Sequence, residues 1–267
     1  MVLLAWIDDA TSRVLARFYE ADTTRGYMDL LGRYMRKYGR PLSVYTDRGG
    51  VFVGKAKDAS GESRHVATQF SRALGELNIE LILAYSPQAK GRIERFFQTA
   101  QDRLVKELTL PKARTLAEAN TLVEEVFVPL LNRRFTVAAQ SAVDVHRPVE
   151  RGLELASILS HRETRVIGQD YTFRYGNRVY QIPAPALAGM RGGRVVIEER
   201  LSGERIFRFR QHRLACTVVP EVRPTTEGVG ALPPAPRSLA PAHPPAECAP
   251  PQKASGQAIP VARVQRR

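Results

Sequence analysis

The sequence has few cysteines, few lysines and no long hydrophobic run. Cys216 and Cys248 are the two cysteines in 267 residues, and they are too few and too far apart for a disulfide framework or a zinc site. No stretch reaches the roughly 18 apolar residues of a membrane-spanning helix, and no basic segment precedes the apolar N-terminus as it would in a secretory signal. These absences predict a cytoplasmic protein in a reducing compartment, with no membrane partner.

Positive charge is what the sequence has in excess, and most of it comes from arginine. Of the 40 basic residues 33 are Arg, against 27 acidic residues, so the formal net charge is +13. A strongly basic chain typically binds a polyanion, usually nucleic acid. Arginine suits forked contacts with phosphate, but a GC-rich gene also enriches it. Composition therefore predicts a nucleic-acid partner and leaves both explanations of the arginines open.

The composition changes sharply near residue 220. Residues 221–267 hold ten of the eighteen prolines and no Phe, Trp or Tyr. Such a segment buries too little apolar surface to offset the entropy of ordering it. We therefore expect residues 220–267 to form a disordered, basic Pro/Ala-rich tail. Its charge is only +3, so +10 belongs to the folded part of the chain.

Residues 1–148 read as one α/β domain. The apolar run 1–7 predicts a strand buried on both faces, and residues 13–19 predict a second strand that completes a hairpin. Further strands and helices alternate after it, which is typical of an α/β fold. We expect helices at 24–38, 69–77, 91–108 and 116–133, strands at 42–45 and 79–84, and a flexible insertion at 54–64.

A connector at residues 149–164 leads to a second domain at 165–219, which reads as a small all-β barrel with turns at 176–177 and 202–203. Arginines and aromatic residues alternate along its strands. This pattern favours nucleic-acid binding, but it also fits an ordinary core with a solvated basic face. The DNA-binding candidates here are Arg174, Arg178, Arg208 and Arg210.

Two carboxylates stand where they could hold a metal ion. Asp47 follows an apolar strand and precedes two glycines, and ligand sites form where such strands end. A carboxylate there suits Mg²⁺, although Asp also caps ordinary turns. Glu94 lies near the start of a long predicted helix, and Lys90 precedes it by four residues, so the two side chains could lie over the same face. That pair fits a metal-bridged phosphate as well as a plain ion pair.

The residues around both carboxylates match known motifs. Residues 45–52 (Tyr-Thr-Asp-Arg-Gly-Gly-Val-Phe) and 86–95 (Ser-Pro-Gln-Ala-Lys-Gly-Arg-Ile-Glu-Arg) resemble the second-Asp and Glu motifs of the DDE, retroviral-integrase-like transposases. Among these, bacterial insertion-sequence transposases of the ISNCY type are the best match. The resemblance implies a ribonuclease-H-like core, a weaker match to a following SH3-like barrel, and Mg²⁺-dependent cleavage and joining of DNA strands, with Mn²⁺ as a substitute.

The resemblance also implies roles for individual residues. Asp47 and Glu94 would be catalytic metal ligands in a site where three carboxylates hold two ions. Lys90 would lie against DNA phosphate. The family's enzymes join DNA ends as multimers, so a homo-oligomer is implied. The residues themselves add a basic pocket edge for a phosphodiester substrate, formed by Arg48, Lys90, Arg92 and Arg95.

The family's first catalytic Asp has no counterpart in this chain. Residues 1–7 match the family's second strand, and we interpret Asp8 and Asp9 as turn residues. We therefore expect a core without its first strand, in an incomplete and weakly active or inactive copy. Two alternatives stay open. One is a non-catalytic, basic DNA-binding or assembly module, and the other is a ribonuclease-H-like nuclease.

Overall fold

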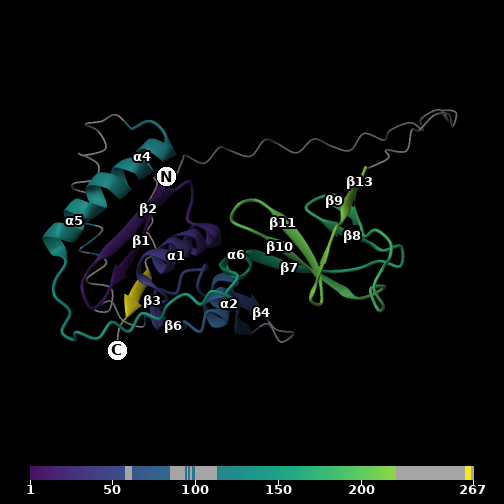
Figure 1. The fold of residues 1–267 in the computed structure, drawn as a ribbon, viewed down its shortest axis with the longest axis horizontal. Helices are drawn as coiled ribbons and strands as arrows, with labels where there is room; N and C mark the ends of the chain where they lie inside the picture. The colour runs from purple at the N-terminus through teal and green to yellow at the C-terminus, as the bar shows by residue number, and fades with distance from the viewer. Residues whose placement is uncertain are drawn as a thin grey trace, which may run out of the picture.

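The computed structural model describes residues 1–57, 62–84, 94, 96, 98, 99, 113–220 and 262–265. The described residues form a mixed α/β part and an all-β part, which lie side by side in Figure 1. Within these ranges, no helix has the length and apolar character needed to cross a membrane.

A five-stranded sheet lies at the centre of the α/β part. Its strand order is β2-β1-β14-β3-β6. β1 and β2 pair antiparallel as the predicted hairpin, and β3 and β6 pair parallel to each other. The strands are β1 (Val2–Asp8), β2 (Val14–Tyr19), β3 (Ser43–Thr46), β6 (Glu80–Leu83) and β14 (Ala262–Gln265).

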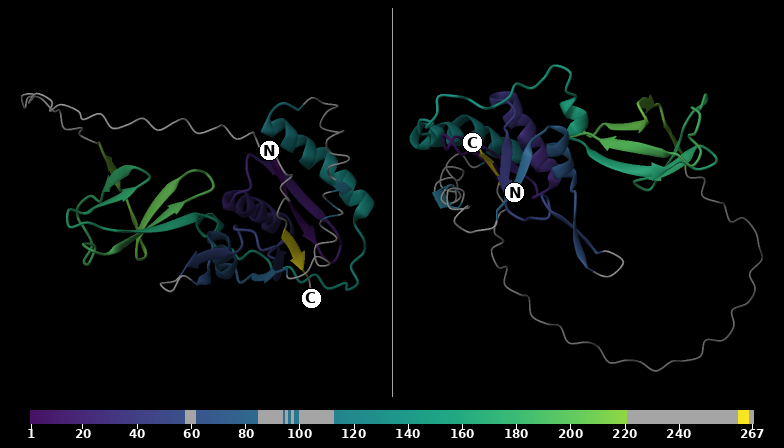
Figure 2. Two further views of the ribbon diagram at one scale, coloured as in Figure 1. Left: turned by 180° about the vertical axis from the view of Figure 1, so that it is seen from behind. Right: turned by 90° about the horizontal axis from the view of Figure 1, so that it is seen from below.

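The central strand β14 comes from the segment that we expected to be disordered. It pairs parallel with β1 and antiparallel with β3, and Figure 2 shows it in yellow beside the purple strands. The expectation of disorder is wrong for these four residues. The physical reason is that the facing edges of β1 and β3 need hydrogen-bond partners, which β14 supplies from far along the chain. The rest of the tail lies outside the described residues.

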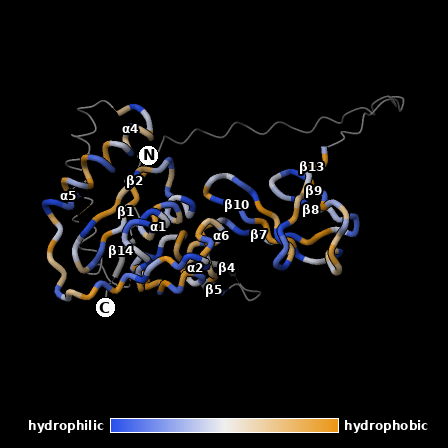
Figure 3. Tube along the Cα trace, viewed as in Figure 1, coloured by the Kyte–Doolittle hydropathy of each residue, from blue (hydrophilic) through white to orange (hydrophobic). Residues whose placement is uncertain are grey.

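Helices cover both faces of the sheet. On one face α1 (Thr24–Tyr38) and α2 (Gln69–Glu76) pack against a core that includes Leu4 and Trp6 of β1. The alternate residues of β1, beginning with Leu3, pack on the other face. β1 is therefore buried on both sides, as its continuous apolar run predicts. Figure 3 shows the apolar stretches along β1 and β2.

Both ends of α1 are capped by residues that are typical of helix boundaries. The side chain of Thr23 accepts a hydrogen bond from the N–H of Gly26 at 3.2 Å and so caps the N-terminus. Gly39 ends the helix with φ +92°, a conformation that favours glycine. A Cβ atom at Gly39 would stand only 3.0 Å from the carbonyl oxygen of Arg147. Glycine therefore allows the chain after residue 146 to pack closely against the end of α1.

The helix predicted at 116–133 contains an unexpected π-helical turn. The helix runs through α4 (Leu116–Leu122), η2 (Val123–Phe127) and α5 (Val128–Phe135) without a break. Pro129 lies in the first turn of α5 and has no N–H to donate. A π turn just before it accommodates this irregularity. Of the helix predicted at 91–108, only four residues are described, and they are helical.

The polar segment 54–64 is partly ordered, contrary to the expectation of a flexible insertion. β4 (Gly54–Lys57) and β5 (Ser63–Val66) form a two-stranded antiparallel ribbon. A Cβ atom at Gly54 would stand 2.7 Å from the carbonyl oxygen of Val66. Glycine there lets the two strands pair closely, which a reading of polarity alone does not reveal.

Residues 161–219, here called the C-terminal β-unit, form two sheets around one core. The first strand begins at His161, four residues before the predicted boundary, and short helix α6 (Leu155–Ile158) precedes it. One sheet contains β12 (His212–Leu214), β11 (Arg205–Phe209), β10 (Arg194–Glu199) and β7 (His161–Val166). The other contains β13 (Thr217–Val219), β9 (Arg178–Gln181) and β8 (Thr172–Tyr175).

Candidate functional site

Asp47 stands at the carboxyl end of β3, where the sequence predicts a ligand site. The N–H of Gly49 donates to Oδ1 of Asp47 at 2.9 Å. The same loop folds back on itself, because the N–H groups of Phe52 and Val53 donate to the carbonyl of Gly49. The carboxylate is half-buried and oriented by its own loop, and neighbouring Arg48 is exposed.

A second carboxylate, Asp22, lies at the same edge of the sheet. β2 and β3 both run antiparallel to β1, so the segments that follow them leave the sheet at one edge. Tyr27 is 1% exposed, packs against Phe52 with ring centroids 4.9 Å apart, and hydrogen-bonds to Asp22. Asp22 is not among the residues predicted from the sequence. Its place just before the helix cap was the available signal, but such acids usually belong to ordinary turns.

Burial raises the pKa of Asp22, the hydrogen bond from Tyr27 lowers it, and the charge of Asp47 raises it. Burial and the charges of Asp22 and Asp47 likewise raise the pKa of Tyr27, which stays protonated as a donor. Two mutually repelling carboxylates at one edge favour a nearby cation. This edge is therefore the acidic part of the candidate site.

Glu94, the other predicted metal ligand, is helical and exposed. Lys90, Arg92 and Arg95 lie outside the described residues. Within the residues that the structure describes, no three His, Cys, Asp or Glu side chains gather as a metal site. The oxygen donors at the Asp47 edge suit Mg²⁺ chemically, but two carboxylates fall short of the three that the motif resemblance implies.

The predicted DNA-binding arginines of the C-terminal β-unit are of two kinds, exposed and ion-paired. Arg174, Arg178 and Arg210 are exposed. Arg208 instead bonds within the protein, through its Nε to Glu198 at 3.0 Å and its Nη2 to Glu154 at 3.3 Å. Sequence alternation places all four on strands or turns, but it cannot tell which guanidinium already has a carboxylate partner.

The aromatic residues of the β-unit are also of two kinds. Phe173 and Tyr180 are buried and stack on each other with centroids 5.4 Å apart, so they form core rather than a platform for bases. Tyr171 and Tyr175 lie at the edge of that core. The guanidinium of Arg191 lies 4.8 Å from the ring centroid of Tyr171, which is cation–π geometry.

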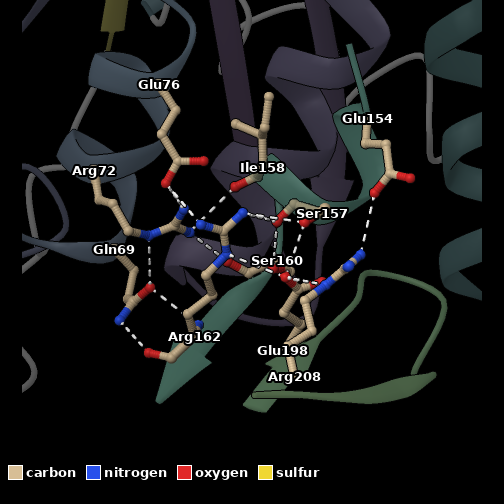
Figure 4. A network of polar contacts seen from close by, with 10 residues as sticks. All are labelled: Gln69, Arg72, Glu76, Glu154, Ser157, Ile158, Ser160, Arg162, Glu198 and Arg208. Atoms are coloured by element: carbon tan, nitrogen blue, oxygen red, sulfur yellow. Dashed lines mark hydrogen bonds and ion pairs between the residues drawn. The ribbon is translucent and has the colours of Figure 1, made fainter. Parts of the chain in front are cut away.

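Polar contacts join α2 to the β-unit (Figure 4). Arg162 of β7 forms an ion pair with Glu76 at 2.8 Å, and its backbone carbonyl accepts a hydrogen bond from Gln69 at 2.7 Å. Arg72 donates to the carbonyl of Ser160 at 2.6 Å. These bonds span the junction between the two parts of the molecule. Together with the contacts of Glu198, which are described next, they are called the clamp.

Glu198 is the buried centre of the clamp. Glu198 is 3% exposed. One carboxylate oxygen accepts from Ser157 and from Arg208, both at 3.0 Å, and Arg162 lies 3.8 Å away. A buried carboxylate needs such partners, because an isolated buried charge is costly. The clamp therefore sets the β-unit in a defined position against α2 and α6.

Two curated proteins are similar to this chain. One is y4bF of Sinorhizobium fredii, named as a transposase, which is 38% identical over 175 residues, covering 65% of this chain and 38% of y4bF. The chain is similar to transposases. A second relative, the transposase for insertion sequence IS1202 of Streptococcus pneumoniae, is 34% identical over 177 residues, covering 65% of this chain and 37% of that protein. The resemblance to transposases read from the two motifs is thereby confirmed.

The chain spans less than two fifths of the length of these curated transposases. A solved intasome of simian T-cell lymphotropic virus, in complex with a PP2A regulatory subunit, aligns with a TM-score of 0.38 and 15% identity. That alignment covers 82% of this chain and 73% of the other. No model of a protein family matches the chain.

Proposed function

We propose that this chain serves DNA transposition, through divalent-metal-dependent cleavage and transfer of DNA strands at the Asp47 edge. The observation that carries the proposal is its similarity to two transposases. The half-buried carboxylate of Asp47 at the end of β3, an interior strand of the sheet, supports it, as does the excess of arginine. In this proposal residues 1–148 are a ribonuclease-H-like core and residues 165–219 an SH3-like barrel.

Asp47 and Glu94 would hold Mg²⁺, or Mn²⁺ in its place, and Arg48, Lys90, Arg92 and Arg95 would contact phosphates. A bound divalent cation would neutralise charge on the phosphate and activate the attacking oxygen. The chain itself orients the carboxylate of Asp47, because the N–H of Gly49 donates a hydrogen bond to one of its oxygens. We further propose that the chain forms a homo-oligomer that joins DNA ends at the bacterial nucleoid.

A strand-transfer assay tests this function. A 3′-hydroxyl DNA oligonucleotide is incubated with plasmid and Mg²⁺ or Mn²⁺, using the chain and a longer version that carries one additional Asp-bearing strand. We expect joining to be much stronger in the longer version, because a third carboxylate neutralises the cations better. Asp47→Asn should abolish joining in either form, while Asp9→Asn, at the opposite edge of the sheet, should preserve it.

A non-catalytic DNA-binding or assembly role is the second candidate. The observation that favours it is the lack of a three-carboxylate group among the described residues. This role predicts DNA binding that needs no divalent metal and that Asp47→Ala does not change. It also predicts that neither the chain nor its longer version joins DNA strands. A ribonuclease-H-like nuclease would instead cleave RNA–DNA hybrids or branched DNA without joining strands.

A further inference from the structure

Two asparagine side chains cover the outer edge of β2, which is an edge strand of the five-stranded sheet. Oδ1 of Asn132 accepts from the N–H of Val14 at 2.7 Å, and its Nδ2 donates to the carbonyl of Val14 at 2.9 Å. Asn120 bonds to Phe18 in the same way, at 2.7 and 3.1 Å. Each amide takes the place of a neighbouring strand, because it pairs with both backbone groups of one residue. Asn120 and Asn132 are called the asparagine pair below.

The asparagine pair reaches β2 only if both side chains lie on one face of the helix. They are 12 residues apart, which is about 3.3 turns of a regular α-helix, so the two side chains would point about a third of a turn apart. The π turn η2 lies between them and takes up one extra residue. The remaining residues make about 3.1 turns. The π turn therefore sets the register in which both amides meet β2.

The helix held by the asparagine pair also supports the helix that carries Glu94. Phe96 lies two residues after Glu94 and is buried in one core with Val123, Phe127 and Leu131. Phe96 and Leu131 also line a cavity of about 400 Å³, so the packing between the two helices leaves room for a shift. A helix packed beside a cavity has fewer contacts to fix it. The place of Glu94 therefore depends on where α5 is held.

We propose that Asn120 and Asn132 are positioning residues, which hold the helix of Glu94 in the position that metal binding requires. The two amides fix α4, η2 and α5 on β2, and that helix in turn packs on Phe96. Neighbours that orient a metal ligand change metal affinity without touching the ion. The inference rests on the proposed function, because only that function makes Glu94 a ligand.

Hydrogen exchange followed residue by residue by NMR tests the asparagine pair itself. In Asn132→Ala the N–H of Val14 should exchange about tenfold faster, because it loses its acceptor, while the N–H of Phe18 changes little. Asn120→Ala should have the reverse effect. If both N–H groups exchange in these variants as they do in the unaltered chain, the asparagine pair does not hold β2 and the proposal is overturned.

Two changes of length test the register, and both are made together with Pro129→Ala, because proline breaks a regular helix. Deleting Glu125, which is exposed, leaves one residue fewer between the asparagines, so a regular α-helix keeps both of them on β2. Inserting one alanine after Glu125 puts them out of phase instead, and the N–H of Val14 or Phe18 should exchange about tenfold faster. Equal exchange in the two proteins would refute the register set by η2.

Metal affinity and hydrogen exchange together test the positioning of Glu94. Binding of Mn²⁺ to the full chain is followed by electron paramagnetic resonance. We expect Asn132→Ala to weaken it about tenfold, as changes to the partners of metal ligands do, and to speed exchange at Phe96. Val195→Ala, in the core of the C-terminal β-unit, is the control for lost stability and should change neither. Faster exchange at Val14 alone, with Mn²⁺ affinity and Phe96 unchanged, would overturn the positioning role.

The two proposals fail separately. If Asp47→Asn and Glu94→Gln leave Mn²⁺ binding unchanged and no version joins DNA strands, the proposed function falls, while faster exchange at Phe96 in Asn132→Ala still supports the hold on this helix. If both carboxylate variants weaken Mn²⁺ binding but Asn132→Ala does not, the positioning role falls and the function stands.

Discussion

Phe70 shows how much of the core depends on single aromatic residues. It is fully buried, stacks on Trp6 with centroids 6.2 Å apart, and meets Tyr27 and Phe52 edge to face at 6.0 and 5.4 Å. Tyr27 in turn holds Asp22 beside Asp47. Packing in this cluster and the shape of the acidic edge are therefore linked, and a cavity at Phe70 would disturb both.

Phe70→Ala should lower the free energy of unfolding by about 3–5 kcal/mol, because it removes a buried ring and leaves a cavity. Urea denaturation followed by circular dichroism measures this. Phe135→Ala makes the same chemical change at a side chain that is 45% exposed, and it should cost less than about 1 kcal/mol. Equal effects of the two substitutions would show that this aromatic cluster is not the core.

Burial raises the pKa of the Cys216 thiol to about 11, above its usual 9.0. The thiolate is the reactive form, so Cys216 should react with iodoacetamide at pH 8 much more slowly in the folded chain than in urea. Its folded pKa is raised, so its contribution to stability is present below pH 9 and is lost as the pH rises towards 11. Mass spectrometry of the Cys248→Ser variant follows this one thiol. Equal rates in both states would refute the shift.

At the scale of the elements, β14 is what closes the sheet between β1 and β3. Its pairing is carried by backbone groups, with Val264 opposite Asp8 on one side and Val44 on the other. Forty-two residues separate Val219 from Ala262 in the sequence, so the tail has ample length to return. Without β14 two largely apolar strands would present unpaired edges, which favours aggregation.

Val264→Pro tests this role, because proline removes a ladder N–H from a central strand and constrains its backbone. We expect a lower melting temperature and more light scattering on heating. Val229→Pro, the same change in the proline-rich segment, serves as the control and should leave both unchanged. If the two variants melt alike, β14 does not stabilise the sheet.

Local sequence patterns predicted the elements that local physics determines. The apolar run of β1, its hairpin partner β2 and the helix α1 are all where the sequence places them. Features that depend on contacts between distant residues were not predictable in this way. These include β14 in the sheet, Asp22 beside Asp47, and the pairing of Arg208 with Glu198.

At the scale of the whole molecule, the clamp holds two separately formed cores in one arrangement. Glu198 is its most buried charge and faces both Arg162 and Arg208. The clamp therefore sets where the C-terminal β-unit stands relative to the α/β part.

Glu198→Ala should destabilise the chain by about 3–5 kcal/mol, because it leaves two arginines near each other without their buried carboxylate. Limited proteolysis should then cut faster around residues 149–160. The control, Glu204→Ala, removes an exposed carboxylate and should cost less than about 1 kcal/mol. Unchanged proteolysis and stability in Glu198→Ala would mean that the two parts do not depend on the clamp.

Mn²⁺-dependent joining of a 3′-hydroxyl oligonucleotide to plasmid DNA tests the central claim most directly. The comparison is between the version of the chain that carries one additional Asp-bearing strand and its Asp47→Asn variant. We expect the longer version to join DNA strands. Asp47→Asn should reduce this joining by more than the roughly 10- to 100-fold loss that is typical of changes around metal ligands, and it should preserve DNA binding in EDTA. Equal joining by both proteins would contradict a catalytic site at the Asp47 edge.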